Sequence, residues 1–139
     1  MFKKNLIRFP SILLLCLAVY LISCTEAKTK GDNSILPMLP TLKEKQESSL
    51  QALLTGVLVL DGACLRVGEK MIIWPKGFTL SSKGGVISVY NNENSLVSSV
   101  GDSIELSGGV TNDLSHLEGK LEGFKNGICV GPYWIAGEQ

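Results

Sequence analysis

The sequence predicts an all-β fold: a small antiparallel barrel or roll, for which an OB-like barrel is one candidate. From about residue 51 onward the chain consists of short runs rich in Val, Ile and Leu. Turn-forming Gly, Pro, Asn and Asp separate these runs at intervals of about nine residues, which is typical of a sandwich or barrel. This part of the chain has fewer than about 100 residues, which is enough for the core of one domain and not of two. We expect strands at residues 55–60, 63–67, 71–74, 78–80, 86–90, 96–100, 103–106 and 133–136.

The first expected strand ends in a continuous aliphatic run from Val57 to Leu60. Strands that are covered on both faces have such runs, so we expect this strand to be central and buried on both sides. Asp61-Gly62 then supplies a turn, because both residue types tolerate a left-handed backbone. Pro75 ends the third strand, since it has no N–H for a sheet hydrogen bond.

The strand at residues 103–106 shows the clearest pattern. Apolar residues alternate with polar ones, so Ile104 and Leu106 should face the core. The glycine pairs Gly84-Gly85 and Gly108-Gly109 suit tight hairpin turns before and after it.

The stretch from Asn112 to Asn126 has a different pattern. Leu114, Leu117 and Leu121 are spaced for one side of a helix. Two glycines in the stretch weaken a helix by about 1 kcal/mol each relative to alanine. We therefore expect either a short helix or an irregular insertion that lids one end of the barrel before the last strand.

The N-terminus has the pattern of a secretory signal. A basic end precedes an apolar run at residues 12–22, which is shorter than the roughly 20 apolar residues of a membrane span. The run ends in Leu21-Ile22-Ser23-Cys24, which resembles the bacterial lipobox. The resemblance implies cleavage after Ser23, diacylglycerol on the Cys24 thiol and a further acyl chain on the new amino group. The bilayer is then a partner, held through acylated Cys24. An uncleaved membrane anchor and an ordinary signal peptide are the alternatives.

These patterns divide the chain into three parts. Residues 1–23 are the expected signal peptide, residues 24–50 a lipidated tether and residues 51–139 the β-domain. The tether is polar and contains Pro and Gly, so it buries too little apolar surface to order itself. Thr41 and Glu44 match a capping box, which predicts a short helix within the tether.

The expected location is the cell envelope, outside the cytoplasm. Because Thr25 rather than Asp follows Cys24, the sorting rule implied by lipoproteins places the protein on the periplasmic face of the outer membrane in a Gram-negative organism. In another organism it would lie on the outer face of the cell membrane. The mature chain keeps 10 Lys and Arg against 13 Asp and Glu, a balance that does not favour nucleic acid as a partner.

One cysteine pair should be oxidised. Cys16 leaves with the signal and Cys24 is acylated, so Cys64 and Cys129 remain for a disulfide in an oxidising compartment. A metal site is the competing interpretation, but His116 is the only histidine and no second cysteine lies at ligand spacing. We expect no metal and no other cofactor.

Several motifs are spread along the β-domain: Gly56 with Leu58 and Leu60, Cys64-Leu65, Trp74-Pro75-Lys76-Gly77, Gly101 to Gly109, and Cys129 with Gly131-Pro132-Tyr133-Trp134. In combination they resemble a family of small bacterial secreted or lipid-anchored proteins of uncharacterised function. The resemblance covers about residues 56–136 and implies no activity.

The aromatic residues Trp74, Phe78, Tyr133 and Trp134 have two interpretations. The favoured one is core packing, because large aromatic side chains fill a small barrel and this domain has few of them. The other is an aromatic rim that contacts a sugar or a peptide.

Catalysis is not expected. A serine nucleophile needs a base within hydrogen-bond reach, and the one imidazole, His116, lies in a polar segment typical of a solvated loop. Asp102 and Glu105 suit glycoside hydrolysis only by residue type, and Asp102 is better explained as a turn residue.

Three functions therefore remain as hypotheses. The leading one is a non-catalytic envelope lipoprotein that binds a partner protein or envelope component. The second is a small barrel that binds an oligosaccharide or peptidoglycan fragment. The least favoured is a hydrolase that uses His116.

Overall fold

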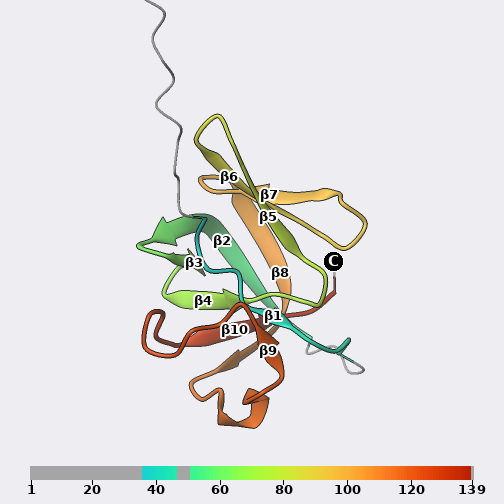
Figure 1. The fold of residues 1–139 in the computed structure, drawn as a ribbon, viewed down its shortest axis with the longest axis vertical. Helices are drawn as coiled ribbons and strands as arrows, with labels where there is room; N and C mark the ends of the chain where they lie inside the picture. The colour runs from blue at the N-terminus through green and yellow to red at the C-terminus, as the bar shows by residue number, and fades with distance from the viewer. Residues whose placement is uncertain (1–35, 47–50, 139) are drawn as a thin grey trace, which may run out of the picture. The chain divides into compact units, whose positions relative to one another are not determined.

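Five strands close into a barrel in the computed structural model, which describes residues 36–46 and 51–138 (Figure 1). The order around the barrel is β10-β4-β3-β2-β8. The β4–β10 pair is parallel and the other pairs are antiparallel. The predicted all-β barrel is thus confirmed. Its strands are β2 (Ala52–Asp61), β3 (Cys64–Val67), β4 (Lys70–Ile73), β8 (Ser103–Thr111) and β10 (Tyr133–Ala136).

The barrel has OB-like topology. Numbered by their appearance in the chain, its strands run first, second, third, fifth and fourth around the ring, and the third and fifth are parallel. This five-stranded Greek-key arrangement is the one of OB-folds.

Smaller elements flank the barrel on opposite sides in Figure 1. A three-stranded sheet of β5 (Thr79–Lys83), β6 (Val86–Tyr90) and β7 (Leu96–Ser99) connects β4 to β8. On the other side, β1 (Thr41–Leu42) pairs with β9 (Leu121–Glu122), next to a single 3₁₀ turn, η1 (Ser115–Leu117).

The core lies inside the barrel and extends under the three-stranded sheet. Trp74 and Phe78 stack with ring centroids 5.7 Å apart. Ile104 and Leu106 are buried there, as the alternation in β8 predicts. The buried residues of this core are Leu58, Leu65, Val67, Ile72, Trp74, Phe78, Val89, Ile104, Leu106, Trp134 and Ala136.

The prediction that β2 is covered on both faces is wrong. The strand pairs with a neighbour along each edge, but Leu58 on its inner face is its one buried residue. Leu58 is 0% exposed, whereas Val57 and Val59 on the outer face are 44% and 39% exposed. The continuous aliphatic run therefore combines a buried core position with an uncovered apolar surface.

The prediction of a hairpin turn at Gly108-Gly109 is also wrong. β8 continues through both glycines, and Gly108 pairs with Ala52 of β2 and with Ala136 of β10. A glycine is needed at this crossing because a side chain on Gly108 would meet the backbone of Ile135.

Part of the predicted tether is folded onto the barrel. Pro40, Thr41 and Leu42 are buried, and the backbone of Trp74 exchanges hydrogen bonds with Pro40 and Leu42. Thr41 and Leu42 form a strand, so the predicted helix does not begin there. The folded part therefore begins before residue 51. The predicted signal peptide and Cys24 lie outside the described residues.

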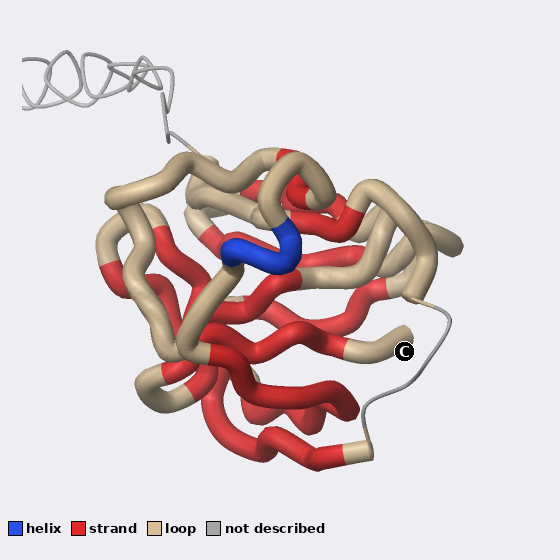
Figure 2. Tube along the Cα trace, turned by 90° about the horizontal axis from the view of Figure 1, so that it is seen from below, coloured by secondary structure: helices blue, strands red, loops and turns tan. Residues whose placement is uncertain are grey.

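The connection from β8 to β10, residues 112–132, is called the lid below. It contains η1 and β9 within irregular backbone, in agreement with the predicted short helix or insertion. Figure 2 shows η1 in blue, lying over the strands of the barrel. Among the described residues, no helix has the length and apolar character to cross a bilayer.

Candidate functional site

The lid and residues 38–42 cover the outer side of β4. Leu114, Leu117 and Leu121 of the lid pack against a cluster that contains Ile73. Phe124 and Tyr133 pack against a second cluster that contains Met71. OB-folds commonly bind ligands on the face of their second and third strands. Here much of that face is occupied by the chain itself.

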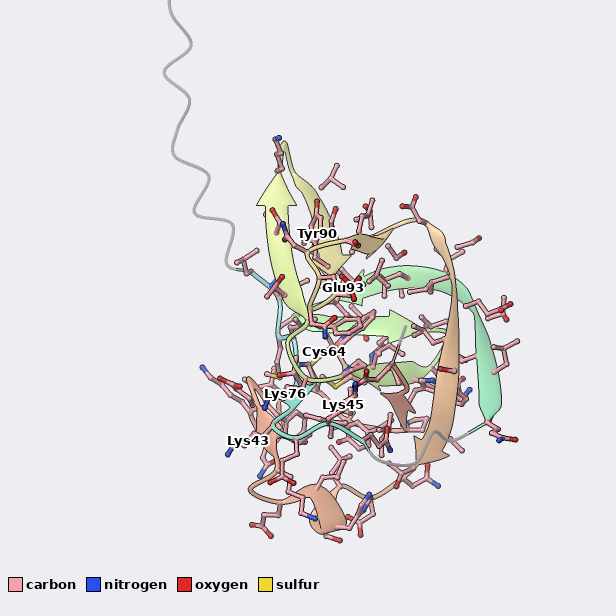
Figure 3. The ribbon with its side chains drawn as sticks, turned by 90° about the vertical axis from the view of Figure 1, so that its right-hand side faces the viewer. Lys43, Lys45, Cys64, Lys76, Tyr90 and Glu93 are labelled. Atoms are coloured by element: carbon pink, nitrogen blue, oxygen red, sulfur yellow. A yellow bond between two sulfur atoms is a disulfide. The ribbon has the colours of Figure 1, made fainter. Side chains whose placement is uncertain are left out.

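A disulfide and an arginine hold the lid on the barrel. Cys64 at the start of β3 is bonded to Cys129, with the two Cα atoms 5.8 Å apart, so the predicted pair is confirmed. Figure 3 labels Cys64 beside the yellow sulfur atoms. The guanidinium of Arg66 donates to the carbonyl oxygen of Val130 at 2.9 Å and lies 3.2 Å from the carboxylate of Asp61.

The lid contains a cavity of about 400 Å³, which is called the lid cavity below. Its walls include half-buried apolar side chains, and its rim includes exposed polar ones. A volume of this size is within the range of small-molecule sites in proteins. It is lined by Asp113, Leu114, Ser115, Leu117, Glu118, Gly119, Leu121, Phe124, Asn126, Gly127, Cys129, Val130 and Tyr133.

The aromatic residues from the sequence analysis separate into two groups. Trp74, Phe78 and Trp134 are buried in the barrel core, so these three do not contact a ligand at the surface of the described domain. Tyr133 lines the lid cavity. Phe124 was not predicted as a site residue, yet its ring meets that of Tyr133 edge-on, with the ring centroids 6.2 Å apart. Its position three residues after Leu121 was the available signal, since it continues the apolar spacing of the lid.

The polar segment around His116 does not have the arrangement of a catalytic triad. The Ser115 hydroxyl donates directly to the Asp113 carboxylate at 2.5 Å, and the backbone N–H of Ser115 donates to it at 2.8 Å. These two hydrogen bonds hold the pKa of Asp113 below its usual value. In a triad the imidazole lies between the hydroxyl and the carboxylate. His116 is exposed on η1.

The two other candidate acids lie on or next to the outer side of β8. The Asp102 carboxylate accepts a hydrogen bond from the Ser99 backbone N–H at 3.2 Å, as a turn residue does. Glu105 is exposed in the middle of β8. Within residues 36–46 and 51–138, no group of three or more His, Cys, Asp or Glu side chains is placed to hold a metal ion.

A second candidate site is the outer face of β2. Leu53, Val57 and Val59 alternate with inward residues and are 61%, 44% and 39% exposed. Thr55 is exposed between them. The neighbouring β8 residues Ser103, Glu105 and Ser107 pair with Val57, Thr55 and Leu53. These seven residues are called the β2 face.

Comparisons with known proteins add no relative: no protein-family model, curated protein or solved structure matches the chain.

Proposed function

We propose that this chain is a non-catalytic lipoprotein of the cell envelope, anchored through acylated Cys24, whose β-domain binds a protein partner through the β2 face. The lipobox-like ending of the signal supports the anchor. The disulfide supports export, because such bonds persist in oxidising compartments. In a Gram-negative organism the location is the periplasmic face of the outer membrane, and otherwise the outer face of the cell membrane.

The observation that carries partner binding is the exposed aliphatic row on β2. Full burial of a Val or Leu side chain contributes about 1.5–3 kcal/mol, so covering three that are roughly half exposed contributes about 1 kcal/mol each. Apolar side chains that gather on one exposed face are a candidate interaction surface when no neighbouring element covers them. A folding role does not explain it, since Val57 and Val59 are not in the core.

The charge on the β2 face defines the partner further. Glu105 pairs with Thr55 and is the one charged residue among the seven. The complementary surface has apolar side chains that cover Leu53 and Val57, and a Lys or Arg that faces Glu105.

Photo-cross-linking in intact cells tests this proposal. With benzoylphenylalanine at Thr55, irradiation should give an adduct to one partner protein, since Thr55 lies between Leu53 and Val57. Adding Val57→Glu should decrease the yield of the adduct at least about tenfold. The interface would remove water from the new carboxylate without offering it an ion-pair or hydrogen-bond partner.

The matched control is Val86→Glu, which adds the same charge to a valine that is 51% exposed on β6 and outside the β2 face. It should leave the adduct unchanged. Absence of an adduct, or equal loss with both variants, would refute binding through the β2 face.

The lid cavity favours a second function, the binding of a small ligand such as an oligosaccharide or peptidoglycan fragment. Tyr133 is the residue of the expected aromatic rim that supports it, because its side chain lines this cavity.

A further inference from the structure

We propose that the fold selects Asn126 of the lid for a spontaneous covalent modification, in which its side-chain amide becomes a carboxylate through a cyclic imide formed with Gly127. The site does not depend on the proposed anchor or partner. Three observations support it: the glycine that follows Asn126, the unpaired backbone N–H of that glycine, and the hydrogen bonds that restrain the other described asparagines.

The reaction needs only atoms of the chain and water. The Gly127 backbone nitrogen loses its proton and attacks the side-chain carbonyl carbon of Asn126. The new N–C bond closes a cyclic imide, and the side-chain nitrogen leaves as ammonia with that proton. Water then opens the ring at one of its two carbonyl carbons. Opening at the side-chain carbon gives aspartate, whereas opening at the backbone carbon gives isoaspartate, in which the main chain runs through the former side chain.

Glycine is the following residue that favours this attack most, because it has no Cβ atom to crowd the ring. Asn126-Gly127 is the only Asn-Gly pair in the sequence. Both residues are exposed and lie outside the strands of the lid. Apart from the chain neighbours of Gly127, no described atom lies within 4 Å of the position that a Cβ would take there. The two reacting groups therefore have room to rotate toward each other.

The attacking nitrogen is also available. Within the described residues, the Gly127 N–H has no hydrogen-bond partner. The turn around it is closed by one long hydrogen bond, in which the Ile128 N–H donates to the Lys125 carbonyl oxygen at 3.5 Å. A contact of this length is weak, so the turn opens at low cost and the Asn126 side chain can reach the nitrogen.

The asparagines of the β6–β7 connection are restrained. The backbone N–H groups of Glu93 and Ser95 both donate to the side-chain oxygen of Asn91, at 3.1 and 2.9 Å. These are the N–H groups with which Asn92 and Asn94 would have to cyclise. The Asn91 side chain must itself break both bonds before it can move. Each cyclisation in this connection therefore costs hydrogen bonds that the Asn126 site does not have.

Asn112 is restrained in the same way. It precedes Asp113, whose backbone N–H donates to the Thr111 hydroxyl at 3.2 Å. Asp113 also has a side chain, which crowds the imide as glycine does not. Exposure therefore does not separate the two sites, since Asn112 and Asn126 are both exposed, and the state of the following N–H does.

The modification would change the lid at a position between two attachments. Phe124 packs against the Met71 cluster, and Cys129 is bonded to Cys64. Isoaspartate adds one carbon atom to the main chain between Phe124 and Cys129. Either product also adds a negative charge to the lining of the lid cavity, to which Asn126 belongs.

Peptide mapping of the aged full-length protein tests the proposal. The folded chain is incubated in a neutral detergent at physiological temperature, and liquid chromatography with mass spectrometry follows each asparagine. Asn126 should convert at least about tenfold faster than any other described asparagine, because the others must first break hydrogen bonds. Aspartate and isoaspartate should both form, and the rate should rise with pH, because the nitrogen attacks in its deprotonated form.

Asn126→Gln is the matched variant, because glutamine keeps the amide but closes an imide more slowly. Asn126 is exposed, so the variant should fold, and conversion at this position should cease. In guanidinium chloride the advantage of Asn126 over Asn94 should shrink at least about threefold, because the Ser95 N–H loses its hydrogen bond.

A synthetic peptide of residues 122–128 is the control for the chemistry. An Asn126 that stays intact in the folded protein while the peptide converts fully would overturn the proposal. Faster conversion at another described asparagine, aspartate as the sole product, or an advantage over Asn94 that denaturation leaves unchanged would also overturn it.

Discussion

Replacing Gly108 with valine should destabilise the barrel by at least about 3 kcal/mol. Gly108 has φ +148°, a conformation that residues with a side chain rarely adopt. A Cβ atom there would overlap the carbonyl oxygen of Ile135 and lie 2.7 Å from the indole nitrogen of Trp134. Because β8 joins β2 and β10 at this residue, either the closure of the barrel or the buried indole has to move. Urea denaturation, monitored by tryptophan fluorescence, measures the loss of unfolding free energy.

Gly84→Asn is the matched control for Gly108→Val. Gly84 has φ +60° in the β5–β6 turn and open space around its Cα, and asparagine tolerates this conformation. The unfolding midpoint of the Gly84→Asn variant should stay close to that of the unmodified protein. A stable Gly108→Val variant with an unchanged midpoint would show that β8 does not pass between β2 and β10 as described.

Removing the disulfide with Cys64→Ala and Cys129→Ala should cost about 4 kcal/mol of unfolding free energy. The bond joins residues 65 positions apart, so it removes much of the chain entropy of the unfolded state. The lid should respond first, because it has few buried side chains of its own and the bond attaches it to β3. Chemical denaturation measures the loss of unfolding free energy of the whole domain, and hydrogen exchange of the lid amides measures the local opening of the lid.

The unmodified protein in excess reductant is the control for the double variant, and the two should unfold at the same denaturant concentration. If the oxidised and reduced proteins have equal stability and equal exchange in the lid, the bond has no role in holding the lid on the barrel.

Local chemistry made most of the barrel predictable from the sequence. Turn residues such as Asp61-Gly62 separate the strands, and the alternation around Ile104 and Leu106 identifies the inner face of β8. The role of Gly108 was not predictable, because a glycine at a crossing of strands and one in a hairpin turn look the same in sequence. The burial of Leu42 was not predictable for a similar reason, since it depends on contacts with β4 and the lid.

The candidate sites were less predictable than the fold. Elimination among the cysteines identified Cys64 and Cys129 because only two were available. The aliphatic row on β2 was interpreted as a buried strand, since sequence cannot distinguish an apolar face that is covered from one that is open. Similarly, Tyr133 and Trp134 are neighbours in sequence, yet one lines the lid cavity and the other lies in the core.

We propose that a lipid on Cys24 holds this β-domain at the envelope, where both the partner and the oxidised cysteines are expected. Intact-mass spectrometry of protein recovered from separated membrane and soluble fractions tests it most directly. We expect membrane-bound chains that begin at Cys24 and carry diacylglycerol with a further acyl chain. Soluble cytosolic chains that begin at Met1 and carry an unmodified Cys24 would contradict it.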